Sequence, residues 1–237
     1  MPLRDVREMR VPGPASGFMH STRERILHHL KRQPDASVDA LVRALELAPM
    51  TIRQHLSNLA AEGLVDVATE EQHGKRRATG RPAHIYNLTP RSDERFPKSY
   101  DRLALLLLEE FESGSTDAPI SLGDRSTAGQ RHEFYRRIAR RAAEPHRERL
   151  QGLAAQPRAE AAVAILREES GFTEIQPTSA GYEVREYNCV FQRVAEGHGE
   201  VCTFHTEYIA ELIGAPAQLD ACQCDGASAC RFSFSLE

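Results

Sequence analysis

The side chains of this chain that are best suited to chemistry are its five cysteines, all of which fall in the last fifty residues. The first 188 positions contain no cysteine, whereas thiols that serve as small hydrophobic side chains would be scattered through a core. The clustering therefore predicts a thiol-rich site that binds a metal or responds to redox state. Its candidate members are Cys189, Cys202, Cys222, Cys224 and Cys230.

The rest of the chain indicates where these thiols reside. The N-terminal residues lack the apolar stretch and cleavage pattern of a secretion signal, and no run of about eighteen apolar residues occurs. We therefore expect a cytoplasmic protein that does not enter the membrane. Structural disulfides are rare in a reducing compartment, and five is an odd number, so both observations favour a metal or redox site over disulfides.

The spacing of the cysteines indicates what kind of metal site to expect. Twelve residues separate Cys189 from Cys202, and twenty-seven separate Cys202 from Cys230, whereas zinc fingers rely on closely spaced cysteine pairs. Widely spaced ligands suit a cluster held inside a folded domain, and thiolates are the usual ligands of iron–sulfur clusters. We expect Cys202 in the first turn of a helix over 200–213, where the helix dipole favours the thiolate.

A second group of residues has the pattern of a DNA-binding module. Apolar residues at helical spacing predict helices over 22–33 and 37–45, and Pro49 opens a third helix that Gly63 stops. The pattern then changes to two strands, 64–68 and 84–88, which flank a basic turn over 72–82. Three helices followed by a hairpin with a basic tip predict a winged helix-turn-helix.

The third helix has the two faces that a DNA-reading helix requires. Ile52, Leu56 and Leu59 form its predicted buried face, and the opposite face is polar. Arg suits guanine and Gln or Asn suits adenine, each pairing contributing about 1–3 kcal/mol of discrimination, while cations in the wing suit phosphates or the minor groove. The candidate DNA-contacting residues are Thr51, Arg53, Gln54, Asn58, Lys75, Arg76, Arg77 and Arg81.

The remaining pattern predicts an α+β fold in four segments. Residues 1–20 are expected to form a disordered tail and 21–92 the winged helix-turn-helix. Residues 93–156 are expected to form a helical linker and dimerisation region, with a leucine-rich helix over 100–111 and an arginine-rich helix over 130–149 that Pro145 ends or kinks. Residues 157–237 are expected to form an α+β sensor domain with helices over 159–169 and 200–213. Its predicted strands cover 172–176, 182–187, 219–224 and 230–234.

Two stretches of sequence resemble known regulators. The segment APMTIRQHLSNLAAEGLV, followed by GKRRATGRPAHIYNLT, resembles the winged-helix domain of ArsR- and DeoR-like bacterial regulators. Ala48 departs from that pattern, because such regulators tend to have a Ser cap there, and the loss of a cap costs about 1 kcal/mol. The segments NCVFQRVAEGHGEVC and DGASACRF resemble the C-terminal domain of SufR-type iron–sulfur repressors.

The second resemblance implies a ligand set. It places Cys189, Cys202 and Cys230 as ligands of an iron–sulfur cluster, with [4Fe-4S] expected and [2Fe-2S] as the alternative. The resemblance leaves the fourth ligand open, because the extra cysteine found in some members has no counterpart here. The candidates are Cys222, Cys224, a histidine such as His198 or His205, a carboxylate or an exogenous molecule, and Cys222 and Cys224 are equally compatible with plain core thiols.

Together these observations predict a homodimeric, non-enzymatic repressor that reads a palindromic double-stranded operator. The resemblance further implies that it senses iron–sulfur status for cluster-assembly genes and binds DNA in the cluster-bound form. The first alternative is a winged-helix regulator whose C-terminal domain binds zinc or an organic ligand. The second is an enzyme with Cys222 and Cys224 as a redox dithiol, which lacks an accompanying general base or Cys-x-x-Cys motif.

Overall fold

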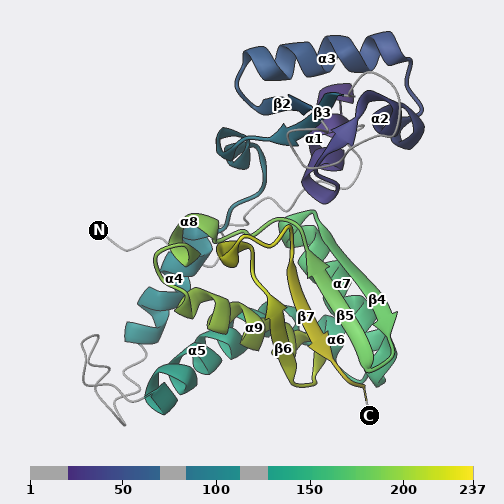
Figure 1. Cartoon of the computed structure of the whole chain (residues 1–237). Coiled ribbons are helices and arrows are strands. Elements are labelled where there is room, and N and C mark those ends of the chain that lie inside the picture. The colour runs from purple at the N-terminus through teal and green to yellow at the C-terminus, as the bar shows by residue number, and fades with distance from the viewer. Residues whose placement is uncertain (1–20, 70–83, 113–127, 237) are drawn as a thin grey trace, which may run out of the picture.

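The computed structural model describes residues 21–69, 84–112 and 128–236. Its N-terminal part contains the three predicted helices and the predicted pair of strands (Figure 1). A short strand that the sequence did not predict, β1, joins them in a sheet of order β1-β3-β2. The elements are α1 (Thr22–Arg32), β1 (Ala36–Ser37), α2 (Val38–Leu45), α3 (Pro49–Ala61), β2 (Val65–Thr69) and β3 (His84–Leu88).

Local sequence explains where these helices begin. Ser21 caps α1 in a reciprocal capping box with Glu24, and the Ser37 side chain accepts a hydrogen bond from the Ala40 amide at the start of α2. Pro49 occupies the first turn of α3, where no backbone N–H is needed, and Ala48 provides no side-chain cap. The predicted departure at Ala48 is therefore present, and packing rather than capping must hold the start of α3.

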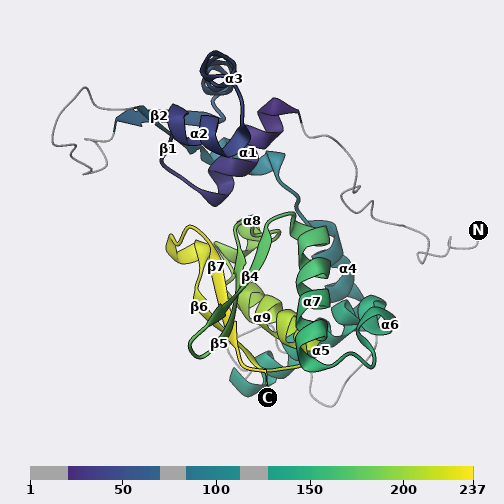
Figure 2. The ribbon, with the colours of Figure 1, turned by 90° about the vertical axis from the view of Figure 1, so that its right-hand side faces the viewer.

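The C-terminal part is a four-stranded antiparallel sheet with helices against one face. The strand order is β4-β5-β7-β6, and α7 and α9 cover the same face of the sheet (Figures 1 and 2). A short 3-10 helix, η3 (Pro90–Arg95), and helix α4 connect this part to the N-terminal part. Its other elements are α4 (Tyr100–Glu112), α5 (Ala128–Ala143), η4 (Glu144–His146), α6 (Arg147–Leu150), α7 (Ala155–Ser170), β4 (Thr173–Thr178), β5 (Gly181–Glu186), α8 (Gln192–Ala195), α9 (Glu200–Ile213), β6 (Ala217–Ala221), η5 (Gln223–Asp225) and β7 (Cys230–Phe234).

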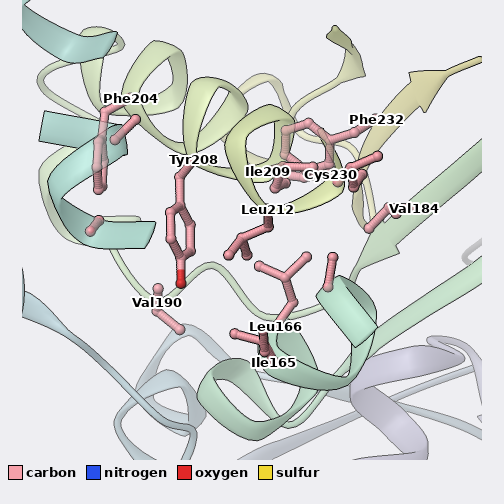
Figure 3. Packing of buried hydrophobic residues seen from close by; sticks show 14 of the residues in the cluster. Ile165, Leu166, Val184, Val190, Phe204, Tyr208, Ile209, Leu212, Cys230 and Phe232 are labelled. Atoms are coloured by element: carbon pink, nitrogen blue, oxygen red, sulfur yellow. The ribbon is translucent and has the colours of Figure 1, made fainter. Parts of the chain in front are cut away.

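Alternation along β7 shows how the sheet packs on the helices. Cys230, Phe232 and Phe234 are buried on the helix-covered face, whereas Arg231 between them is exposed. Helix α9 lays an apolar side, which includes Leu212, against this face, and α7 completes the core (Figure 3). The sheet therefore has one buried and one solvent-facing side.

A polar network is enclosed within this helical layer. Glu169 of α7 pairs with Arg102 of α4 and accepts a hydrogen bond from the Tyr208 hydroxyl of α9 at 2.9 Å. His146 lies 3.3 Å from the same carboxylate, and Arg102 donates to the Tyr208 hydroxyl at 3.2 Å. The network joins three helices, so its charges are expected to fix how α4 sits on the sensor part.

Two predicted elements are interrupted or shortened. The arginine-rich helix predicted over 130–149 is broken at Pro145 as expected, because the 3-10 turn that contains Pro145 separates α5 from α6. The strand predicted over 219–224 ends at Ala221 after an irregular register between Leu219 and Ala221. Cys224 therefore lies in a 3-10 turn and Cys222 directly before it, so the two are not on one face of a strand.

The arginines of α5 are engaged within the chain. Arg137 and Arg141 pair with Glu110 of α4, at 2.6 and 3.3 Å, and the Glu110 side chain is buried. Arg140 pairs with Glu211 of α9 at 3.3 Å. These contacts tie α5 to α4 and α9 of its own protomer.

None of the helices that the structure describes has the length and apolar character needed to cross a membrane.

Candidate functional site

The outer face of α3 presents the predicted DNA-reading residues. Arg53, Gln54 and Asn58 are exposed and Thr51 is half-buried, while the apolar face of the helix is buried in the N-terminal core. The Gln54 amide donates to Asn58 Oδ1 at 3.3 Å, so these two side chains lie together on the surface. Helix α3 lies at the end of the molecule away from the C-terminal sheet (Figures 1 and 2). The predicted wing cations Lys75, Arg76, Arg77 and Arg81 fall outside the described residues.

Three cysteines converge where α9 begins and β6 ends. Cys202 Sγ lies 3.7 Å from Cys222 Sγ and 4.0 Å from Cys224 Sγ, and the three sulfurs all lie within 4.8 Å of one another. The turn at η5 makes this possible, because Cys222 Sγ accepts a hydrogen bond from the Cys224 amide at 3.3 Å. Gly226 closes the turn with a φ of 85°, a left-handed conformation that suits glycine.

The other two cysteines border this group. Cys230 begins β7 opposite Glu186 of β5, and its sulfur accepts a hydrogen bond from the backbone amide of Gln223 at 3.4 Å. Cys189 follows β5 and lines, together with Cys202, a small cavity of about 20 Å³. Of the three cysteines predicted as ligands, Cys202 belongs to the tight group, and Cys189 and Cys230 adjoin it. The tight group also contains both thiols that the sequence left open, Cys222 and Cys224.

Burial keeps these thiols protonated when no cation is near. Burial raises the pKa of Cys189 to about 11, and it raises the pKa values of Cys202 and Cys230 well above their usual range. Cys202 lies in the first turn of α9 as predicted, but burial and the neighbouring thiols raise its pKa, whereas a lowered pKa was expected there. Burial and the neighbouring Cys222 side chain also raise the pKa of Cys224, which disfavours its thiolate and weakens the dithiol-enzyme alternative. The same thiols can ionise when a cation compensates their charge.

A histidine–carboxylate pair, with the carboxylate buried and the histidine half-buried, lies beside the cysteines. His205 follows Cys202 by three residues on α9, and its Nε2 lies 2.6 Å from Glu186 Oε2 of β5. The other Glu186 oxygen accepts a hydrogen bond from the Thr173 hydroxyl at 3.2 Å, and the Glu186 side chain is buried. Burial lowers the pKa of His205, but the Glu186 carboxylate outweighs burial and raises it. Both residues line the same cavity as Cys189 and Cys202.

The segment that contains Cys189 is hydrogen-bonded to the linker from the N-terminal part. Lys98 Nζ donates to the Cys189 carbonyl at 3.1 Å, and the Ser99 amide donates to the Val190 carbonyl at 3.1 Å. Asn188 is almost completely buried, and its amide donates to the Pro97 carbonyl at 3.0 Å and to the Ser170 carbonyl at 3.2 Å. Each of residues 97–99 is therefore hydrogen-bonded to the loop over residues 187–191, which we call the cysteine loop.

The N-terminal part also packs directly on the sensor part. The Phe172 ring at the start of β4 belongs to the core of the N-terminal part, 4.8 Å from the His28 ring and 5.3 Å from the Phe96 ring. Arg32 of α1 lies over the Phe172 ring and pairs with Glu174 at 3.2 Å. Movement of the sensor part at β4 is therefore expected to reach α1.

Sequence reasoning missed three residues of this site. Glu186 had a signal, because it follows Val184 by two on a predicted strand and so shares its inward face. A carboxylate on a buried face requires a partner, and here that partner is His205. Asn188 and Lys98 had no local signal, since they are close only because the linker crosses the cysteine loop.

This geometry defines a class of protein: a winged helix-turn-helix with an exposed polar face on its third helix, joined to a C-terminal part that contains clustered cysteines. Residues 20–67 match the model of the family described as bacterial regulatory protein, arsR family. The chain thus contains an ArsR-family helix-turn-helix domain and is a DNA-binding transcriptional regulator, a class that points away from an enzyme. No curated protein and no solved structure matches the chain.

Proposed function

We propose that this regulator is a homodimeric repressor that senses iron–sulfur status and binds a palindromic operator in its cluster-bound form. The cluster-assembly genes implied by the sequence resemblance are the proposed targets. The observation that carries the proposal is the position of the thiol site. The loop that contains Cys189 is hydrogen-bonded to the linker that leads to the DNA-binding helices.

The donor set fits an iron–sulfur cluster. Cys189, Cys202 and Cys230 are the proposed ligands, with Cys222 or Cys224 as candidates for a fourth sulfur, and thiolates are the usual ligands of such clusters. Backbone amides already donate to the sulfurs of Cys222 and Cys230, and hydrogen bonds of this kind tune cluster potentials. When bound, a cluster supplies the cationic charge that lets buried thiols ionise, together with sensitivity to oxygen and iron supply.

Coupling to DNA is proposed to run through the linker. Any change in the position of the Cys189 loop alters the contacts of Asn188 with Pro97 and of Lys98 with the loop carbonyl. Residues 97–99 precede α4 and follow η3, so these contacts set how the DNA-binding helices are held on the sensor part. A coupling of about 1–3 kcal/mol, which is ordinary for two linked binding sites, would change operator affinity roughly 5–150-fold.

The dimer is proposed to form through α4. Leu105, Leu108 and Phe111 lie three residues apart on one side of this helix, and between 38% and 58% of each side chain is exposed. Winged helices that read two half-sites must be held about 34–36 Å apart, which requires a second copy in a fixed position. Within the predicted dimerisation region, the arginine-rich α5 is less suitable as an interface than α4, because several of its arginines pair within the protomer.

The test is anaerobic purification followed by operator titration. The expected protein is brown, contains iron and acid-labile sulfide, and loses operator affinity after exposure to oxygen or removal of the cluster. Scrambled DNA of the same length serves as the control, because a general loss of folding would lower both affinities. Equal operator affinity with and without the cluster would contradict the switch.

A second candidate function, zinc sensing, is favoured by the close approach of three thiols. The sulfurs of Cys202, Cys222 and Cys224 lie within 4.8 Å of one another, and the neighbouring cavity of about 20 Å³ suits an occupant the size of one water or ion. Zinc is bound by thiolates in a tetrahedral arrangement. A colourless protein with one zinc per chain and no sulfide would support this function and contradict the iron–sulfur proposal.

A further inference from the structure

The imidazole of His205 lies next to the cysteine site, and the proposed function gives it no role. It lines the same small cavity as Cys189 and Cys202, and it lies one helical turn after Cys202 on α9. Its ring is packed against the rings of Phe191 and Phe232, each with its centroid 5.8 Å away. The ring is therefore held in one orientation before anything binds.

The two ring nitrogens of His205 differ in their surroundings. Nε2 is paired with Glu186, whose second oxygen is fixed by the Thr173 hydroxyl. Nδ1 is inaccessible to solvent and has no hydrogen-bond partner among the described residues. A buried ring nitrogen without a partner is costly to maintain, so it requires an explanation.

The pairing of Nε2 with a carboxylate is the arrangement that accompanies metal-binding histidines. Such residues almost always donate their second ring N–H to a carboxylate or carbonyl, which fixes the tautomer and makes the free nitrogen more basic. When a bound metal displaces the proton of the other nitrogen, an imidazole that donates through Nε2 presents a lone pair on Nδ1. The Glu186–His205 pair therefore offers a preoriented nitrogen ligand beside Cys202.

A second buried polar atom near the cysteines is a weaker candidate for a ligand. Gln223 Oε1 has no hydrogen-bond partner in the part of the chain that the structure describes, although its amide nitrogen donates to the carbonyls of Tyr187 and Ser228. A carboxamide oxygen is a hard ligand that suits magnesium or calcium, whereas imidazole suits iron and zinc. In a thiol-rich site the nitrogen of His205 is the better match.

We propose that His205 is a ligand, through Nδ1, of the metal group that the cysteines bind, with Glu186 as its positioning residue. The inference rests on the proposed function in that it requires metal at the thiol site. It adds that the coordination is mixed sulfur and nitrogen, so the fourth ligand of a cluster held by Cys189, Cys202 and Cys230 is His205 and not a further thiol. A nitrogen ligand raises the reduction potential of a cluster above that of an all-thiolate one.

The direct test needs no substitution. Full-length protein is purified anaerobically with ¹⁵N-labelled histidine, reduced with dithionite, and measured by pulsed electron paramagnetic resonance. The expected result is a ¹⁵N coupling strong enough for direct coordination. A reduced cluster without that coupling overturns the inference while leaving the iron–sulfur proposal intact.

Variants then assign the nitrogen. His205→Cys is expected to retain iron and sulfide, lose the nitrogen coupling and show a lower reduction potential. Glu186→Gln is expected to keep the coupling and to bind iron about 10–100-fold more weakly, as is typical when the partner of a ligating histidine is lost. His198 is the matched control, because it lies in the loop directly before α9 and is exposed. His198→Ala is expected to leave all of these properties unchanged, and loss of the coupling in His198→Ala but not in His205→Cys would refute the assignment.

A separate arm covers failure of the proposed function. If the purified protein contains no iron and sulfide, the iron–sulfur proposal fails, and the ¹⁵N-histidine apoprotein is loaded with cobalt(II) alone. A nitrogen coupling that disappears in His205→Cys then supports the inference for a single metal ion. Cobalt bound without any histidine coupling overturns it.

Discussion

The contact between Asn188 and the linker gives the sharpest prediction about the proposed control of DNA binding by the thiol site. Asn188 is 1% exposed, and its amide donates to the carbonyls of Pro97 and Ser170 at 3.0 and 3.2 Å. Asn188→Ala removes both of these hydrogen bonds, leaving the Pro97 and Ser170 carbonyls without this donor, and it also removes the 3.5 Å contact of Asn188 Oδ1 with Lys98 Nζ. Each lost hydrogen bond with an unsatisfied partner costs about 1–3 kcal/mol, so the loss of two should lower the free energy of unfolding by about 2–6 kcal/mol.

The effect on regulation should be larger than this loss of stability suggests. Because the Asn188–Pro97 contact joins the cysteine loop to the linker, we expect the ratio of operator affinities with and without the cluster to fall close to one. The assays are urea unfolding of the apoprotein and operator titration of both forms. The iron and sulfide content of the variant should match that of the unchanged protein, since the side chain of Asn188 is not a proposed ligand.

Asn87 provides a matched control within the DNA-binding part. Its side chain also makes two hydrogen bonds, one to Asp35 Oδ1 at 2.8 Å and one from the Asp35 amide at 2.7 Å. Asn87→Ala should cost a similar free energy of unfolding but keep the affinity ratio. If Asn188→Ala binds its cluster and retains the full ratio, the linker is not the route of coupling and the reasoning fails.

Four further predictions follow from the structure. Burial raises the pKa of Glu169, but His146, Arg102 and Tyr208 outweigh burial and hold it at about 2, below the ordinary 4.5. Glu169 should therefore contribute stability above about pH 4.5 that is lost as the pH falls toward 2. Unfolding measurements on Glu169→Gln should show a free energy of unfolding lower by on the order of 3 kcal/mol at neutral pH and unchanged near pH 2. Leu108→Glu should give a monomer by sedimentation with unchanged circular dichroism, and a persisting dimer would exclude α4 as the interface. Arg53→Ala should weaken operator binding by about 1–3 kcal/mol, whereas the exposed Arg43 of α2 should tolerate the same change, and equal losses would indicate only a general charge effect. Cys202→Ser should abolish metal binding by elemental analysis, and full metal content in that variant would show that the group within 4.8 Å is a set of core thiols.

The DNA-binding part was largely determined by local sequence. Apolar residues at helical spacing, the Ser21 capping box and Pro49 at the start of α3 specify the three helices, and all three are present. The residues 20–67 that match the regulator family lie within this stretch. Such patterns are readable because each helix has to bury one stripe of side chains, and the stripe recurs every three to four residues.

The cysteine site was only partly readable from the sequence. The clustering of five thiols predicted a site, but the end of β6 at Ala221, which brings Cys222 and Cys224 toward Cys202, depends on a register irregularity against β7. A one-residue change of register moves every side chain of a strand to the opposite face, so sequence alternation alone did not determine which thiols meet.

The sequence by itself determined which functional parts the protein contains: a DNA-reading helix in the first half and a group of thiols suited to soft metals in the last fifty residues. Only the tertiary structure decided how these parts are joined. The pairing of Glu186 with His205 and the contact of Asn188 with Pro97 link residues 19 and 91 positions apart. Such contacts arise because buried polar groups must find partners across the fold, and local periodicity carries no information about which distant group will be there.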